Sequence, residues 1–253
     1  MDENLITQYR YFLKDSIRKE IDFSQTDQNR GIDIPPVEKP YRADALCIDL
    51  VKPGAWKNFT GTDIVAAIRN RESRRAYTQE PLTLEEISFL LWATQGVRGE
   101  VVDGHAYRTV PSAGCRHAFE TYLVVLNGKG LDLGVYRYLP LAHQLLFEFS
   151  EERLAGKLVD AVFRQPYPGN AAVTFIWTAI PYRMEWRYHL AAHKVIAIDA
   201  GHVCQNLYLA CEAIGAGTCA SAAYDQEALD RLLRIDGKDE FAVYLSPVGK
   251  VRD

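Results

Sequence analysis

Residues 119–149 read FETYLVVLNGKGLDLGVYRYLPLAHQLLFEF and contain three strand-like runs separated by short turns. The runs are rich in β-branched and aromatic residues, as strands usually are, and they span residues 119–126, 134–138 and 144–149. Asn127-Gly128 bounds the first run, and Leu139-Pro140 joins the other two. This arrangement predicts an antiparallel meander.

Helical patterns and two further strands surround the meander. Thr62 is placed to cap a helix that runs to Arg69, and Thr83 and Glu86 form a capping box for a helix that ends near Gly96. The other expected elements are a helix at 152–163, a strand at 171–180, a long helix at 193–214 with Gly215 as its C-cap, a helix from Asp225 to Arg234, and a strand at 241–248. Because helices and strands alternate irregularly around a hairpin-like middle, we predict an α+β fold rather than a doubly wound parallel sheet.

The long helix at 193–214 is apolar around much of its circumference. A solvated helix would show a wider polar face, so we expect this one in the core or at a subunit interface. The first stretch of the chain shows little periodicity beyond a short helical pattern near its start, and prolines interrupt it. We therefore expect an N-terminal arm at residues 1–60 and one domain at residues 61–253.

The composition excludes several classes of function. The 253 residues are 48% hydrophobic with a formal net charge of -4, which is too balanced for a nucleic-acid surface or a membrane-binding stripe. The N-terminus lacks the apolar core of a signal peptide, and no stretch approaches the roughly 20 apolar residues of a membrane span. Five cysteines without a C-x-x-C pair fit reduced thiols. We therefore expect a cytoplasmic protein with neither nucleic acid nor membrane as partner.

The segment Arg71-Glu72-Ser73-Arg74-Arg75 is the first candidate binding motif. If it is extended, alternation points Arg71, Ser73 and Arg75 to one side. Two guanidinium groups and a hydroxyl would then converge, which suits a phosphate monoester. A solvated basic helix end is the competing interpretation of this motif taken alone.

Three later segments complete the candidate site. Pro111-Ser112-Ala113-Gly114-Cys115 consists of small residues that would let backbone amides approach a planar ligand, although it is equally a tight turn. Small residues at 218–223, among them Ser221, Ala222 and Ala223, offer further amides ahead of a helix. Lys250 and Arg252 in the tail are cations that could join the first motif.

Together these segments resemble the nitroreductase superfamily from about Thr62 onward, and most closely its SagB-type dehydrogenase branch. The matching patterns are Arg71-x-Ser73-Arg74-Arg75, Leu84-x-x-x-Ser88-x-Leu90-Leu91-Trp92-Ala93, Arg108-Thr109-x-Pro111-Ser112-Ala113-Gly114, Gly134-x-Tyr136-x-Tyr138 with His143, and Asp199-Ala200-Gly201-His202-x-x-Gln205-Asn206-Leu207. The resemblance implies a central, mainly antiparallel sheet flanked by helices, in an intertwined homodimer with FMN at its interface.

The resemblance also implies roles for individual residues. Arg71 and Ser73, with Arg74 beside them, would contact the phosphate end of FMN, and Arg75 would lie near the flavin pyrimidine, where a fixed cation stabilises the negative charge of the reduced ring. Residues 111–115 would line the ring, and amides of Ser221, Ala222 and Ala223 would reach toward it. Lys250 and Arg252 would complete the phosphate site. Hydride would arrive from NADH or NADPH and leave to a small-molecule substrate in a ping-pong reaction.

One position departs from the family's azoline-oxidising members, which carry a Lys-Tyr pair before the long helix. Here Arg187-Tyr188 occupies the place, and an arginine is no practical general base. We expect Arg187 to recruit an anionic group and Tyr188 to donate a hydrogen bond, with a surface arginine and a packed tyrosine as the alternative.

Three functions follow as hypotheses: an FMN enzyme that uses NADH or NADPH to reduce nitro, quinone or related acceptors; a dehydrogenase that oxidises an azoline, peptide or metabolite with oxygen as acceptor; and a scaffold subunit without flavin. No metal site is expected, because His189 and His193 stand four apart without a third ligand. Gly215-Ala216-Gly217 lacks the third glycine of a dinucleotide fingerprint. Cys115 is either a redox-active or a packed thiol.

Overall fold

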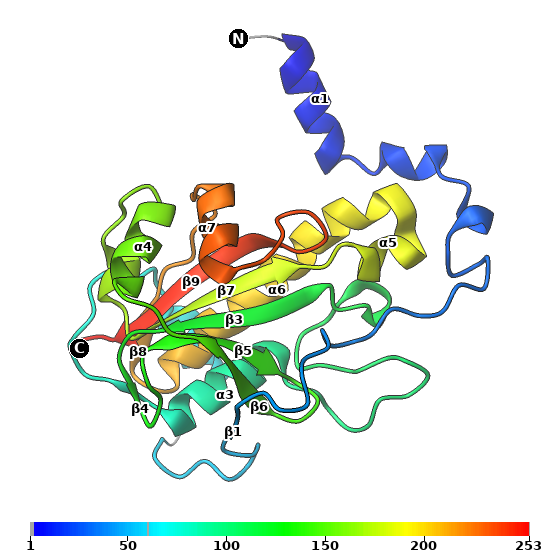
Figure 1. The fold of residues 1–253 in the computed structure, drawn as a ribbon. Helices are drawn as coiled ribbons and strands as arrows, with labels where there is room; N and C mark the ends of the chain where they lie inside the picture. The colour runs from blue at the N-terminus through cyan, green and yellow to red at the C-terminus, as the bar shows by residue number, and fades with distance from the viewer. Residues whose placement is uncertain (1–2, 60, 253) are drawn as a thin grey trace.

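The computed structural model describes residues 3–59 and 61–252, and a seven-stranded sheet forms its centre (Figure 1). The strand order is β1-β6-β5-β3-β7-β9-β8, and every neighbouring pair is antiparallel. The strands are β1 (Cys47–Asp49), β3 (Phe119–Val125), β5 (Gly134–Leu139), β6 (Gln144–Phe149), β7 (Val173–Ala179), β8 (Ala216–Thr218) and β9 (Phe241–Lys250). Two short strands, β2 (Leu82–Thr83) and β4 (Gly128–Lys129), form a separate parallel pair.

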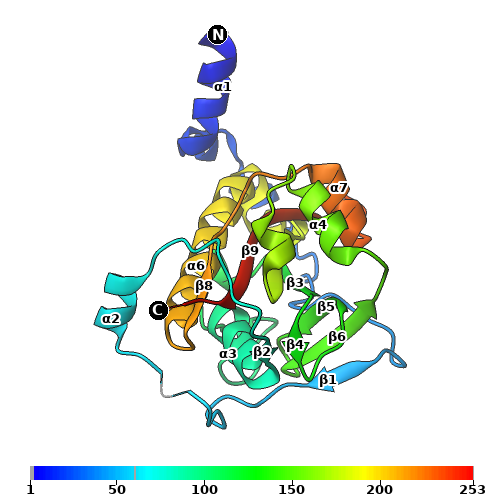
Figure 2. The same cartoon turned by 90° about the vertical axis from the view of Figure 1, so that its left-hand side faces the viewer.

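Helices cover both faces of the sheet (Figures 1 and 2). The α-helices are α1 (Glu3–Leu13), α2 (Ile64–Asn70), α3 (Leu84–Gln95), α4 (Leu154–Ala161), α5 (Tyr182–Tyr188), α6 (Ala192–Glu212) and α7 (Gln226–Leu233). Short 3₁₀ helices lie at Ser16–Glu20, Phe23–Gln25, Ala113–Cys115, Tyr167–Asn170 and His189–Ala191. None of the described helices has both the length and the apolar character needed to cross a membrane.

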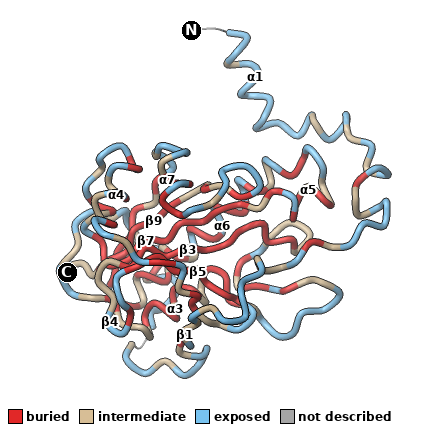
Figure 3. The backbone as a smooth tube through the Cα atoms, in the orientation of Figure 1, coloured by how far each residue is buried: buried red, intermediate tan, exposed pale blue. Residues whose placement is uncertain are grey.

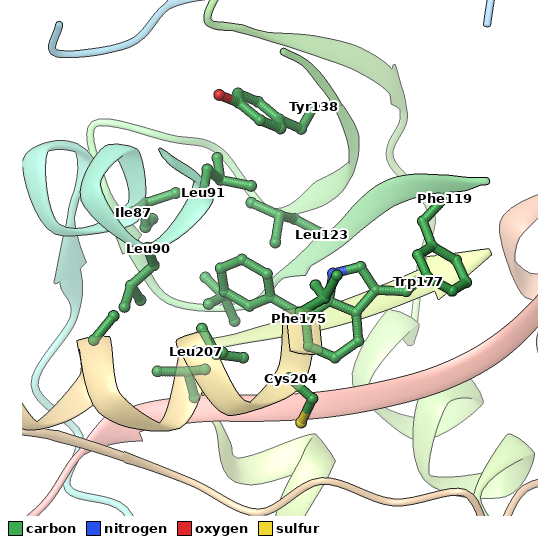
Figure 4. Packing of buried hydrophobic residues seen from close by; sticks show 14 of the residues in the cluster. Ile87, Leu90, Leu91, Phe119, Leu123, Tyr138, Phe175, Trp177, Cys204 and Leu207 are labelled. Carbon is green, nitrogen blue, oxygen red and sulfur yellow. The ribbon is translucent and has the colours of Figure 1, made fainter. Parts of the chain in front are cut away.

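Alternation along the strands builds a separate core on each face. On β3, Leu123 and Val125 pack with α3 and α6, whereas Tyr122 and Val124 pack with α4 and α7. Figure 4 shows the first core, in which Phe175 and Trp177 of β7 pack in one cluster with residues of α3 and α6. Because helices cover both faces, β3 and β7 are buried at every position, which explains their nearly continuous apolar sequence.

The N-terminal residues divide into two parts. Helix α1 projects from the body and is exposed along most of its length (Figures 1 and 3). Farther along, β1 pairs with β6 as the edge strand of the sheet, with Cys47 opposite Leu146. The later half of the expected arm is therefore built into the same sheet as the rest of the chain.

The structure confirms the α+β class and the antiparallel meander, and it corrects some helix ends. Asp63, not Thr62, caps α2, because its carboxylate accepts the amide of Val65. Helix α6 ends at Glu212 with Ala213 as its C-cap, so Gly215 follows the cap, at a φ of +61°. The predicted capping box of Thr83 and Glu86 is present.

Candidate active site

The Arg71–Arg75 segment is extended and lies against the sheet edge at β8. Ser73 forms a parallel bridge with Thr218, and the amide of Arg74 donates to the Thr218 carbonyl at 2.9 Å. This attachment fixes the alternation of side chains, so that Arg71 and Ser73 point to one side. Arg74 points elsewhere: its Nε lies 2.8 Å from a Glu72 carboxylate oxygen.

Two tyrosines outside the predicted motifs contact these residues. Ser73 Oγ lies 3.1 Å from the Tyr208 hydroxyl, and the Arg71 guanidinium lies 5.4 Å from the centre of the same ring. Arg75 lies over Tyr167 at 5.8 Å. No signal in the sequence marks Tyr208 as different from other aromatic residues of an apolar helix, because its partners lie far away along the chain.

The small-residue segment at 218–223 joins the same cluster. The Ala220 amide donates to the Tyr208 hydroxyl at 2.9 Å, and Ser221 pairs with Leu245 of β9. Ala222 and Ala223 are exposed beside them. We refer to Arg71, Ser73, Arg75 and residues 220–223 as the cation cluster.

Close ion pairs do not account for the charge of the cation cluster in the part of the chain that the structure describes. Neither Arg71 nor Arg75 forms an ion pair within 4.0 Å among the residues that the structure describes. The Arg71 guanidinium, the Ser73 hydroxyl and the neighbouring backbone therefore fit a phosphate monoester, which needs several strong donors.

The Pro111–Cys115 segment lies against a different part of α6. The Ala113 amide is 3.3 Å from the Asp199 carboxylate, and the Ser112 hydroxyl accepts the His117 amide at 3.0 Å. Burial raises the pKa of Asp199, against the opposing effects of Ser112, the Ala113 amide and His202.

Arg187 and Tyr188 of α5 meet this segment at Gly114. A Cβ atom at Gly114 would lie 2.6 Å from the Tyr188 hydroxyl and 2.8 Å from Arg187 Cδ and Nε. The Arg187 guanidinium also lies 5.6 Å from the centre of the Tyr188 ring. We refer to residues 111–115 with Arg187 and Tyr188 as the loop cluster.

The loop cluster and the cation cluster lie at two positions along one helix. Asp199 touches the first and Tyr208 touches the second. Nine residues of α-helix separate these contacts, a distance of roughly 13 Å. The two clusters of one chain therefore lie at separate positions along α6.

The tail runs beside the Arg71–Arg75 segment, since a Cβ at Gly217 would meet both Arg74 and Val251 at 2.6 Å, but the Lys250 side chain is paired elsewhere. The Lys250 ammonium is largely buried and donates to the Glu86 carboxylate, at 2.5 Å, and to the Ile214 carbonyl. This corrects the expectation for Lys250, because its charge is already paired at the start of α3. Arg252 is exposed just beyond β9.

Two titratable groups near the loop cluster have shifted pKa values. Burial raises the pKa of the Cys115 thiol although Arg108 and Arg116 oppose the shift, which favours a packed thiol over a reactive thiolate. Burial, followed by the charges of Arg108, Arg116 and Arg183, lowers the pKa of His117 to about 2. Within the described residues, no group of three or more His, Cys, Asp or Glu side chains could hold a metal ion.

The fold defines the class of protein first: an α+β fold with a mainly antiparallel sheet. A crystal structure of a nitroreductase-type protein from Ralstonia eutropha JMP134 has this fold, with a TM-score of 0.67 at 24% identity over 87% of this chain and 98% of that one. The sequence profile of the Nitroreductase family matches residues 68–250, and the chain belongs to that family.

Two relatives agree with this assignment. A protein of Methanocaldococcus jannaschii that is named as a nitroreductase is 32% identical over 180 residues, which cover 71% of this chain and 87% of that protein. The trifolitoxin-processing protein of Rhizobium leguminosarum bv. trifolii is 28% identical over 163 residues, 61% of this chain and 44% of that protein. The second match is consistent with the SagB-type branch.

Proposed function

We propose that this nitroreductase-family oxidoreductase binds FMN and uses NADH or NADPH to reduce nitro, quinone or related small-molecule acceptors. The cation cluster carries the proposal: the Arg71 guanidinium and the Ser73 hydroxyl lie at Tyr208, the Ala220 amide donates to the same tyrosine, and Arg75 lies over Tyr167. When bound, FMN would supply the hydride transfer that no side chain of the protein can perform.

The residues of the cation cluster would hold the two ends of the cofactor. Arg71 and Ser73, steadied by Tyr208, would bind the phosphate, and the tyrosine ring keeps the guanidinium in place without neutralising it. Arg75 and the amides at 221–223 would face the ring, where fixed donors stabilise negative charge better than water that must reorient. Arg74 is paired with Glu72, so it would add positive charge near the phosphate without a direct hydrogen bond to it.

The loop cluster would serve the same site from a partner subunit. Helix α6 exposes a stripe of residues between the two clusters, namely Ile198, Gly201, His202 and Gln205. Residues at this spacing lie on one helical face, and Ile198 is 50% exposed, which suits contact with a second copy. In such a homodimer, residues 111–115 of one subunit would approach the cation cluster of the other.

Arg187 and Tyr188 would then face the substrate rather than the phosphate. An arginine keeps its proton, so Arg187 would attract an anionic group of the substrate, and the Tyr188 hydroxyl would donate a hydrogen bond. Gly114 allows both side chains to approach the loop closely.

A second candidate is a SagB-type dehydrogenase that oxidises an azoline or another peptide or metabolite substrate with oxygen as acceptor. The match to a trifolitoxin-processing protein favours it. The arginine at position 187 opposes it, because this reaction needs a base. If Arg187→Lys creates azoline oxidation and leaves other activities unchanged, the interpretation that Arg187 prevents azoline oxidation in the wild type gains support, whereas a variant without effect on any substrate would contradict that interpretation.

The visible absorption spectrum of the purified protein is the first test. We expect a flavin spectrum, or its appearance on adding FMN, and an FMN Kd at least about tenfold weaker in Arg71→Ala or Arg75→Ala, because hydrogen bonds to charged groups are lost. Arg42→Ala is the control, since Arg42 is exposed and paired with Asp44.

Two outcomes would change the proposal. A colourless protein that takes up no FMN would favour a scaffold subunit. Anaerobic mixing with NADPH or NADH separates the two enzymatic candidates, because rapid bleaching is expected only if a nicotinamide is the electron donor.

A further inference from the structure

Residues 28–40, which we name the strap, are fastened to the body through their own main chain. Three buried guanidinium groups donate to carbonyl oxygens at alternate positions of the strap: Arg116 to Pro35 at 3.4 Å, Arg108 to Val37 at 2.7 Å, and Arg137 to Lys39 at 2.8 Å. The Lys39 amide in turn donates to Glu120 at 2.9 Å. An extended backbone presents alternate carbonyls to one side, so the strap faces the body like an additional strand.

Two of these arginines stand on either side of the loop cluster. Arg108 precedes Pro111 by three residues, and Arg116 directly follows Cys115. Arg108 and Arg116 are 3% and 0% exposed, so each depends on protein acceptors for its hydrogen bonds. A shift of the strap would leave these cations unsatisfied or would pull the loop with it.

The strap also holds the other half of the loop cluster. Trp186 Nε1 donates to the Ile32 carbonyl at 2.9 Å, and the Gln28 amide donates to the Trp186 carbonyl at 3.0 Å. Trp186 is the residue before Arg187. Arg116 ties the two contacts together, because its guanidinium lies 5.1 Å from the Trp186 ring and its Nε donates to the Arg183 carbonyl.

We propose that the strap is a positioning segment of the candidate active site, which sets the distance between the Pro111–Cys115 loop and the Arg187-Tyr188 pair. The strap lies outside the matched family region, which begins at residue 68. The positioning rests on contacts within this chain, whereas its consequence for flavin binding rests on the proposed function.

A pair of proline substitutions in the full chain tests the positioning. Pro36 is exposed between the held carbonyls of Pro35 and Val37, so Pro36→Gly loosens the strap without removing a packed side chain. Pro53→Gly is the matched control, because Pro53 is also exposed and N-terminal to α2 but lies beyond the strap. Both changes raise the entropy of the unfolded chain to a similar extent.

Hydrogen exchange of the flavin-free protein is the first measurement. In Pro36→Gly, we expect the amides of residues 113–116 and 183–188 to exchange about fivefold faster than in Pro53→Gly. This factor corresponds to the backbone restraint that a proline-to-glycine change removes from the strap. Trp186→Phe, which keeps a ring for Arg116 but loses the donor to Ile32, should show the same pattern. Equal exchange in all three variants would overturn the positioning.

The FMN Kd and the bound-flavin spectrum are the second measurement. With Pro36→Gly and Trp186→Phe, we expect a weaker FMN Kd and a shifted spectrum at temperatures where all variants remain folded. Faster exchange with an unchanged Kd and spectrum would show a strap that restrains the loop but does not serve the flavin. If the wild-type protein binds no FMN, the proposed function fails, and hydrogen exchange still decides the positioning.

Discussion

At the scale of single residues, Gly114 is the position where the candidate site has least room. Its φ is +57°, and a Cβ would collide with Tyr188 and Arg187. Gly99 has a φ of +82° with nothing within 4 Å, so it provides the same backbone conformation without the collision.

Alanine at either position must adopt the left-handed backbone conformation. We therefore expect this strain to lower the free energy of unfolding of Gly114→Ala and of Gly99→Ala by a similar amount, roughly 1 to 2 kcal/mol. Only Gly114→Ala should also lower kcat/KM for NADPH-dependent acceptor reduction, by about tenfold, since it displaces the Arg187-Tyr188 pair. Urea unfolding measures the loss of stability in both variants, and steady-state kinetics measure the loss of kcat/KM. Equal kinetics in both variants would remove Arg187 and Tyr188 from the substrate site.

His117 predicts a pH dependence of stability. Its folded-state pKa of about 2 lies below the ordinary value of 6.5, so between these pH values the unfolded chain binds one more proton and stability falls as the pH falls. Between pH 7 and pH 5, the free energy of unfolding of the wild type should fall by about 2 kcal/mol more than that of His117→Asn. Asparagine tolerates the φ of +47° and never becomes charged. Parallel urea titrations would contradict the prediction if the two proteins lost stability equally.

Alternation along an extended chain is a local property, so the sequence alone predicts that Arg71 and Ser73 share one side, as the structure shows; their role in binding stays a prediction. Tyr208 and Tyr167 were missed, since their roles come from contacts across more than ninety residues of chain. Lys250 was misplaced for the same reason: the sequence shows a cation near the end of a strand but not the Glu86 that neutralises it.

At the scale of elements, the Lys250–Glu86 pair joins the end of β9 to the start of α3. Glu86 also accepts the Thr83 amide in the capping box, so one carboxylate serves both contacts. Both side chains are nearly buried, at 13% and 11% exposed, and a buried charge without its partner is costly.

Lys250→Met should accordingly destabilise the fold by about 3 to 5 kcal/mol while leaving the FMN Kd unchanged. Adding Glu86→Gln should restore part of the loss, because the glutamine needs no cation and can still accept the Thr83 amide. Chemical denaturation and flavin titration of the single and double variants provide the measurement. A weakened Kd with full stability would instead return Lys250 to the phosphate site.

Long elements were predictable and short ones were not. The meander, α3 and α7 follow from periodicity and caps that lie within each segment. The strands β1, β2, β4 and β8 have two or three residues each, which is too short for a pattern, and their partners define them. Helix α5 was missed because its seven residues mix large polar and apolar side chains.

At the scale of the whole molecule, the exposed stripe of α6 determines the assembly that we propose. Gly201 lies on this stripe, and a Cβ there meets nothing within 4 Å in the single chain. Gly156 of α4 is equally open, so it offers a matched control in another helix.

Arginine at either glycine should leave the subunit folded, with up to about 1 kcal/mol gained in helix propensity. Gly201→Arg should convert the expected homodimer to monomers and weaken FMN binding, whereas Gly156→Arg should remain dimeric. Sedimentation velocity at several concentrations reports both. A monomeric wild type, or a dimer that tolerates Gly201→Arg, would contradict an interface through α6.

The contacts of the strap affect the order in which parts of the chain fold during synthesis. Residues 28–40 leave the ribosome early, but the guanidinium groups that bind them belong to residues 108, 116 and 137. At ordinary rates of translation, the strap waits on the order of ten seconds before its binding surface has been made. The strap is thus synthesised before the residues that bind it but docks after them, and the loop beside Gly114 reaches its final shape only when the strap has docked.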